Sequence, residues 1–196
     1  MACILVAGLP ASGKSTLAAA LAKELGFPMF SKDSMKELLY DSVGFQCRAE
    51  KVALGVGAMD ILYYCAGQVL SLGQSVILEN NFENASKPGL QALLEKYACP
   101  VVTVMLTGDP HAIYRRFLER DMSPGRHRGH VVNTCYPEPL GERPPYVPLT
   151  FEQFVEGFRA RGMDAFDVGG PRVTVDVTDF SRVDIKAIAK EVISLL

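Results

Sequence analysis

The sequence predicts a single α/β domain over residues 1–196, built on a parallel β-sheet that helices cover on both faces. Short apolar runs alternate along the chain with longer helical patterns, as parallel sheets require, because each parallel crossover usually contains a helix. The first run, residues 3–8, is fully apolar and ends in glycine, which is typical of a buried parallel strand. With 48% hydrophobic and 21% charged residues, the 196-residue chain suits one compact domain.

The other elements follow from local signals taken in chain order. Residues 14–25 contain good helix formers, and Gly26 closes them as a typical helix-terminating glycine. Asp109 and Pro110 begin a later helix with an acidic cap and a proline in the first turn. The further strands are expected at residues 28–30, 75–78, 101–106 and 173–177. The further helices are expected at about 33–40, where Asp33 or Ser34 could be the cap, and at 47–72, 86–97, 151–161 and 183–196.

Residues 122–148 differ in character from the rest of the chain. Gly125 and several arginines come first, and five of the twelve prolines follow between residues 137 and 148. Such a composition predicts a long, mostly irregular excursion. An excursion of this kind inside a compact domain is usually functional.

Charge and cysteine usage exclude several classes of protein. The net charge of −2 disfavours a protein that mainly coats nucleic acid, because neutralising phosphates requires a basic face, although nucleic acid is not excluded as a partner. The five cysteines are scattered without a CxxC pair, which indicates reduced thiols in a cytoplasmic protein. The apolar N-terminal run is too short to span a membrane, and no other stretch is expected to reach that length.

The strongest functional signal is the sequence GLPASGKS at residues 8–15. It fits the pattern GxxxxGK[ST] without a mismatch, between a predicted strand and a predicted helix. The glycines let backbone N–H groups turn toward phosphate oxygens, and the helix presents its positive dipole end to the same anion. Lys14 is expected to reach the β- and γ-phosphates, and the Ser15 hydroxyl is expected to coordinate Mg²⁺. The predicted ATP-binding residues here are Gly8, Leu9, Pro10, Ala11, Ser12, Gly13, Lys14, Ser15 and Thr16.

The remaining sequence bears on what the nucleotide is used for. The NKxD motif that reads guanine is missing, and the chain is short for a mechanical ATPase. Small size together with an arginine-rich excursion favours phosphoryl transfer from ATP to an acceptor.

Four segments, GLPASGKST, SKDxxK (31–36), ILENNF (77–82) and RRFLER (115–120), together resemble the small P-loop kinases. The similarity is to the predicted-kinase group related to polynucleotide kinase, chloramphenicol phosphotransferase and zeta-toxin. This resemblance implies a three-layer P-loop kinase fold, with a five-stranded parallel sheet in the order 2-3-1-4-5 and a mobile lid over ATP, here at about 122–148.

The same resemblance implies roles for residues on the acceptor side. Asp33 matches an aspartate that faces the acceptor hydroxyl and can accept its proton, although it could also simply cap a helix. Lys36 stands where polynucleotide kinases have arginine, so it keeps the charge and loses the bidentate fork, and it could equally be a solvated residue. Glu79 stands where the group commonly has aspartate and could hold a Mg²⁺-bound water or shape the acceptor pocket. Asn80 could bind an acceptor hydroxyl or only make a turn.

Arginines cluster before and within the expected lid. Between residues 111 and 130 there are five arginines against two acids. Arg116 and Arg120 lie four residues apart on one helix face, and the resemblance implies that such arginines contact ATP phosphates and stabilise charge on the transferred group. They join Lys14 and Asp33 as expected catalytic residues. The alternative is a solvated basic face or ion pairs with Glu119 and Asp121.

These observations predict an ATP- and Mg²⁺-dependent phosphotransferase that acts on a hydroxyl of a small molecule. Two alternatives remain open. The first is a 5′-hydroxyl nucleic-acid kinase, which the acidic net charge and Lys36 disfavour. The second is a non-catalytic ATP-binding regulatory module. The sequence does not indicate the acceptor or the oligomeric state.

Overall fold

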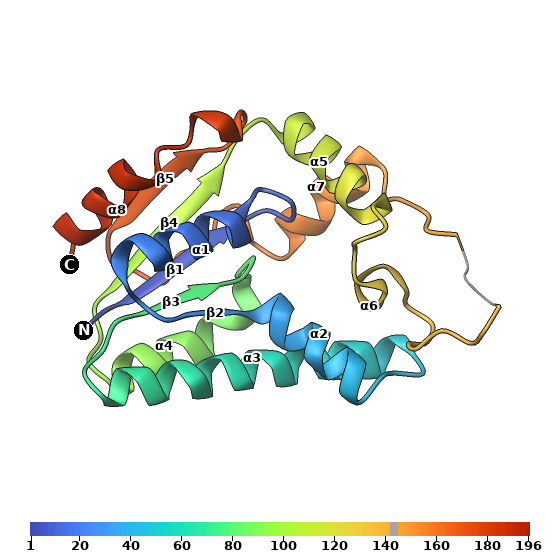
Figure 1. Ribbon diagram of the computed structural model, residues 1–196, viewed down its shortest axis with the longest axis horizontal. Coiled ribbons are helices and arrows are strands. Elements are labelled where there is room, and N and C mark those ends of the chain that lie inside the picture. Colours follow the sequence, from blue (N-terminus) through green and yellow to red (C-terminus); the bar gives the residue numbers. More distant parts are fainter. Residues whose placement is uncertain (142–144) are drawn as a thin grey trace.

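A five-stranded, fully parallel sheet forms the centre of the computed structural model, which describes residues 1–141 and 145–196 (Figure 1). The strands are β1 (Cys3–Gly8), β2 (Met29–Ser31), β3 (Val76–Glu79), β4 (Val101–Thr107) and β5 (Arg172–Asp176). Their order is β2-β3-β1-β4-β5, so the predicted fold class and strand order are both confirmed. Cys3 of the central strand pairs with Val76 on one side and with Val101 on the other.

Helices cover both faces of the sheet (Figure 1). On one face lie α1 (Lys14–Leu25), α5 (Pro110–Met122), α7 (Phe151–Ala160) and α8 (Ile185–Ser194). On the other face lie α3 (Arg48–Ser71) and α4 (Lys87–Lys96). The remaining helices are α2 (Lys32–Ser42) and the short α6 (Arg128–Val131), η1 (Asn84–Ser86) and η2 (Phe180–Arg182). Strand β1 contributes side chains to both hydrophobic cores, because successive side chains of a strand point to opposite faces of the sheet. Ile4 and Val6 belong to one core, and Leu5 belongs to the other.

The second helix begins earlier than the sequence indicated. Its N-cap is Ser31, whose hydroxyl accepts a hydrogen bond from the backbone N–H of Ser34 at 3.5 Å. Asp33 therefore lies inside the first turn, and the interpretation that Asp33 or Ser34 caps this helix is wrong. The Asp33 side chain is left available for another role.

Over residues 122–141 and 145–148 the excursion is mostly irregular, as predicted, but it contains the short helix α6. An antiparallel bridge joins Phe45 to Tyr136 and holds this segment beside the α2–α3 connection. Residues 142–144 of the expected lid lie outside the described part of the chain.

Helix α3 corrects the expectation that no further stretch reaches transmembrane length. It has 24 residues and a window of mean hydropathy 1.3, enough by length and composition alone to cross a membrane. This is weak evidence, because Leu62, Ala66 and Leu70 are buried in the core between α3 and the sheet. All five cysteines are free thiols, as the sequence predicted.

Candidate active site

A cleft of about 700 Å³ opens beyond the carboxyl ends of the strands, where ligands bind in open α/β sheets. Three polar segments meet there: the loop after β1, the start of α2 and the residues after β3. The opposite wall comes from α5 and from residues within 126–133 and 146–149. The polar residues Thr178 and Asp179, which follow β5, do not line the cleft; the Thr178 hydroxyl accepts a hydrogen bond from the backbone N–H of Asp109 at 2.8 Å.

The loop between β1 and α1 has the backbone geometry expected of a phosphate cradle. Gly13 has a φ of +91°, and a Cβ added there would lie 2.4 Å from the Phe180 ring, so only glycine fits. Among the predicted ATP-binding residues, Pro10, Ala11 and 13–16 line the cleft. Gly8, Leu9 and Ser12 lie beneath it. The Ser12 hydroxyl is buried and has no hydrogen-bond partner among the described residues.

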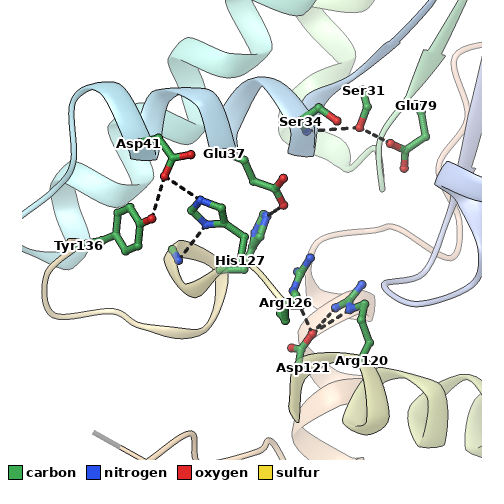
Figure 2. Close-up of polar contacts among 12 residues, drawn as sticks. Ser31, Ser34, Glu37, Asp41, Glu79, Arg120, Asp121, Arg126, His127 and Tyr136 are labelled. Atoms are coloured by element: carbon green, nitrogen blue, oxygen red, sulfur yellow. Dashed lines mark hydrogen bonds and ion pairs between the residues drawn. The ribbon is translucent and has the colours of Figure 1, made fainter. Parts of the chain in front are cut away.

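Lys14 and Glu79 form a buried polar pair at the floor of the cleft. The Lys14 ammonium donates to the backbone carbonyl of Leu9 at 2.7 Å, and burial lowers its pKa to about 8 against the attraction of Glu79 and Asp33. Burial raises the pKa of Glu79, opposed by Lys14 and by a hydrogen bond from Ser31 at 2.5 Å (Figure 2). A buried ammonium with a carbonyl as its hydrogen-bond partner is well suited to an anionic ligand.

Asp33 faces the same cleft from the first turn of α2. Its half-buried carboxylate makes no hydrogen bond to any residue in the described chain. Burial alone would raise the pKa of Asp33, but interactions with nearby groups, among them His130, Lys36 and Arg126, outweigh burial and hold it below the usual value. Asp33 is therefore an ionised carboxylate that can accept a hydrogen bond from a ligand hydroxyl.

Both predicted α5 arginines line the cleft, with different partners. Arg116 donates to the carbonyl of Val177 at 2.7 Å, and its Nε is buried without a partner in the described chain. Arg120 pairs with Asp121 at 2.7 Å, and Arg126 approaches the same oxygen of Asp121 at 3.3 Å (Figure 2). The anticipated ion pair with Asp121 therefore exists, although Arg120 still borders the cleft.

The lid wall also contains residues that sequence reasoning did not select. These residues, which all line the cleft, are Arg48, His130, Asn133, Tyr146 and Arg161. His130 contacts Glu37 at 2.8 Å, and burial, reinforced by Arg126 and Lys36, lowers its pKa to about 3. Arg128 makes a two-fold ion pair with Glu138 at 2.6–2.7 Å and does not line the cleft. No motif or periodicity marks the residues that were missed.

Lys51 of α3 fixes the chain around His130. Its ammonium donates to the backbone carbonyls of His130, at 3.0 Å, and Val132, and to Oδ1 of Asn133 at 3.1 Å. Burial, followed by the nearby charges of Lys36 and Arg48, lowers the pKa of Lys51 to about 7. This buried lysine links α3 to the wall that faces the phosphate loop.

Comparison with known proteins agrees with this geometry. Residues 3–132 match the family model of an AAA domain. Over its whole length the chain is 31% identical to a crystal structure described as a "putative kinase" from Chloroflexus aurantiacus J-10-fl, with a TM-score of 0.81 and 98% of that chain covered. The chain belongs to the small P-loop kinase family.

Other P-loop kinases share the fold at lower identity. A sugar kinase from Janibacter sp. HTCC2649 aligns with a TM-score of 0.57 at 14% identity, covering 100% of this chain and 94% of that one. A shikimate kinase from Bacteroides thetaiotaomicron aligns with a TM-score of 0.54 at 14% identity, covering 99% and 97%. At such identities the likeness shows the fold alone. No curated protein matches the chain.

P-loop kinases generally use a nucleotide with Mg²⁺, and the donor set of this cleft fits that ion. Within residues 1–141 and 145–196, no group of three or more His, Cys, Asp or Glu side chains could hold a metal. Mg²⁺ in nucleotide sites needs no such cage, because it keeps several waters and binds one or two protein oxygens together with phosphates. The Ser15 hydroxyl and the buried Glu79 carboxylate both line the cleft and fit this need.

Proposed function

We propose that this P-loop kinase transfers the γ-phosphate of ATP to a hydroxyl of a small molecule, with Mg²⁺ as the cofactor. The observation that carries the proposal is a single cleft bordered on one side by Lys14 and the phosphate loop and on the other by the free carboxylate of Asp33. A site for the phosphoryl donor and a site for a hydroxyl acceptor thus share one cavity.

In this proposal the phosphate loop binds ATP through residues 8–16. Its backbone amides and the N-terminus of α1 hold the phosphates, and Lys14 exchanges the Leu9 carbonyl for phosphate oxygens. Arg116 and Arg120 approach from α5, with Arg120 exchanging Asp121 for a phosphate oxygen. Ser15, with Glu79 close by, would hold Mg²⁺, and the bound ion would offset charge on the phosphates.

Asp33 prepares the acceptor. The ionised carboxylate accepts a hydrogen bond from the acceptor hydroxyl, aligns its oxygen with the γ-phosphorus and takes its proton as the new P–O bond forms and the bond to ADP breaks. Because its pKa is low, the Asp33 carboxylate acts mainly by orienting the acceptor hydroxyl, and it takes the hydroxyl proton late in the transfer step. Lys36, Glu79 and Asn80 border the space that the acceptor would fill.

Residues 122–148 serve in this proposal as a lid within one domain of residues 1–196. Arg126, Tyr146 and Val147 already border the cleft. Closure over ATP would exclude water from the γ-phosphate and limit hydrolysis. The free thiols fit a cytoplasmic location.

The test is an acceptor screen with ATP-Mg²⁺ that follows ADP release above the rate without acceptor. The panel contains sugars, hydroxy acids, mononucleosides and an oligonucleotide. Stimulation by a small acceptor supports the proposal. Preference for the oligonucleotide would instead favour a nucleic-acid kinase, and tight ATP binding without any transfer would favour a regulatory module.

Asp33→Asn tests the assigned base. With an active acceptor, transfer is expected to fall on the order of 10²–10⁴-fold while ATP affinity stays within about twofold, because the carboxylate acts on the acceptor and not on the nucleotide. Glu95→Gln, on the exposed face of α4, is the matched control and should keep full activity. Full transfer by Asp33→Asn would contradict the assignment.

A further inference from the structure

A second cavity, of about 460 Å³, adjoins the active-site cleft on the side of α3. Six residues line both cavities and form a shared neck: Asp33, Lys36, Arg48, Asn80, Asn81 and Arg161. The cavity volume lies within the range of ordinary ligand pockets. A molecule whose hydroxyl meets Asp33 can therefore continue through the neck into this second space.

Helix α3 lines the second cavity with an apolar stripe, which we call the α3 groove, and with the charged residues Arg48, Lys51 and Asp60 beside it. Val52, Gly55, Val56, Met59 and Tyr63 recur at intervals of three and four residues, so they lie along one side of the helix. Val52 and Val56 remain 50% and 58% exposed, although both are aliphatic. Gly55 leaves the wall open, because an added Cβ would find only the Lys36 Cε at 3.8 Å.

The far end of the α3 groove is held in place by Tyr63. Its hydroxyl donates to the backbone carbonyl of Ser86 at 2.7 Å. Gly89 makes room for the ring, since a Cβ there would lie 2.6 Å from the Tyr63 Cε2 atom. The groove is therefore a built cavity that a fixed aromatic ring bounds.

Two basic side chains of the neck, Lys36 and Arg48, form no ion pair with a carboxylate of the described residues. The Lys36 ammonium makes no hydrogen bond or ion pair with any described residue and lies 5.6 Å from the Tyr40 ring centre. Arg48 donates only to the amide oxygen of Asn133, at 2.6 Å. Arg161, by contrast, approaches Glu83 at 3.7 Å. The side of the neck next to Asp33 thus favours an anionic group.

We infer that the acceptor is an elongated amphiphile with three parts. Its hydroxyl meets Asp33, a carboxylate or phosphate lies between Lys36 and Arg48, and an apolar tail occupies the α3 groove. This inference rests on the proposed kinase function and specifies the class of its acceptor. It also explains why Val52 and Val56 stay uncovered beside a cavity: the tail of the acceptor would cover them.

Three series of acceptors test the inference. The carboxylate series runs from lactate to 2-hydroxyoctanoate, and 1-O-alkyl glycerol 3-phosphates form the phosphate series. The 1,2-alkanediols are the uncharged controls of matching chain length. The KM for the anionic acceptors, from ADP release, should fall about threefold to fourfold for each added methylene, because each CH₂ leaves water for the groove. The diols should be the weaker acceptors. A KM independent of chain length, or no preference for the anionic series, would overturn the inference.

Two glycines of α3 offer a matched pair of variants. Gly55→Leu fills the groove, whereas Gly57→Leu adds a side chain where no atom lies within 4 Å of a new Cβ and outside the groove lining. Both changes improve helix propensity, so neither should unfold the protein. Gly55→Leu should abolish the chain-length dependence and leave ATP affinity unchanged, and Gly57→Leu should behave like the parent. Equal effects of the two variants would overturn the proposal.

Calorimetric titration of 2-hydroxyoctanoate in the presence of ADP-Mg²⁺ separates this inference from the function on which it rests. If no acceptor is phosphorylated but the probe binds the parent and Gly57→Leu, and not Gly55→Leu, the groove assignment stands while the kinase proposal fails. If short acceptors are phosphorylated and the long probe binds no better than lactate, the kinase proposal stands and the amphiphilic acceptor is overturned. Failure of both readouts overturns both.

Discussion

The two walls of the active-site cleft are built in opposite ways. The phosphate-loop wall connects β1, whose residues are all buried, to α1, and the Phe180 ring supports it beneath Gly13. The lid wall has a small buried hydrophobic cluster of Tyr40, Phe45 and Val132, and polar contacts hold the rest of it (Figure 2). One wall is fixed by apolar packing, which is non-directional and cannot be exchanged for a ligand. The other is fixed by charged groups, which can change partners.

The polar contacts of the lid wall reach across to α2. His127 contacts Asp41 at 3.1 Å, and Tyr136 donates to the same carboxylate at 2.8 Å (Figure 2). One helical turn earlier on α2, Glu37 contacts His130 at 2.8 Å. Contacts of this kind are individually modest and weaken when salt or a competing ion is present. We therefore expect the phosphate-loop wall to be preorganised and the lid wall to open locally at low cost in free energy.

The largest expected effect comes from the fixed wall. Lys14→Met keeps the length of the side chain and removes the ammonium at the cleft floor, so transfer should fall on the order of 10³-fold, because a preorganised charge acts most strongly in a buried site. ADP release with a responsive acceptor measures the loss, and calorimetry measures ATP affinity. Lys23→Met, exposed on the same helix, is the control. Unchanged ATP binding and transfer would show that the buried ammonium does not serve the nucleotide.

The contrast between the walls also explains what the sequence could predict. Residues 8–16 are contiguous, so the motif, the strand before it and the helix after it are all visible locally, and the sheet order follows from the family resemblance. The lid contacts join residues far apart in the chain, such as His130 with Glu37 and Lys51 with His130, and no spacing rule links them. Sequence reasoning accordingly missed Lys51 and Arg48. It also placed the N-cap of α2 at Asp33 or Ser34, because no local signal shows that Ser31 both donates a hydrogen bond to Glu79 and caps the helix.

The second largest effect is expected in the lid wall, when Lys51 is replaced. Lys51→Met keeps the bulk but leaves the carbonyls of His130 and Val132 and the amide oxygen of Asn133 without this donor. Unpaired buried acceptors cost about 1–3 kcal/mol, so the free energy of unfolding should fall by about 2–3 kcal/mol. Denaturant unfolding at pH 6, where the ammonium is charged, measures this change.

Hydrogen exchange locates the effect of Lys51→Met. The amides of Val132 and Tyr136, bonded to the carbonyls of Arg128 and Phe45, should lose protection, whereas those of β1 should keep theirs. Lys190→Met, on the exposed surface of α8, should change neither measurement. A uniform loss of protection in both walls would contradict the view that the lid wall opens independently.

The smallest effect is the pH dependence of the lid wall through His130. Burial lowers its pKa to about 3 in the folded protein, from 6.5, with Asp33 opposing the shift and Arg126, Lys36 and His127 adding to it; Glu37 faces the same ring. Between those two values the unfolded chain binds a proton that the folded chain does not. This difference makes stability fall as pH drops below about 6.5, by up to about 1.4 kcal/mol per pH unit.

His130→Gln removes that proton uptake, so the slope of unfolding free energy against pH between 4.5 and 6.5 should become flatter than in the parent. Denaturant unfolding at several pH values gives both slopes. His111→Gln is the control, because His111 is exposed and stacked on Phe151, away from this wall, and should keep the parental slope. Since Lys14 and Glu79 are not altered, ATP affinity at pH 7.5 should also stay unchanged. If His130→Gln and the parent lose stability in parallel on acidification, the buried neutral histidine does not set the acid sensitivity of this wall.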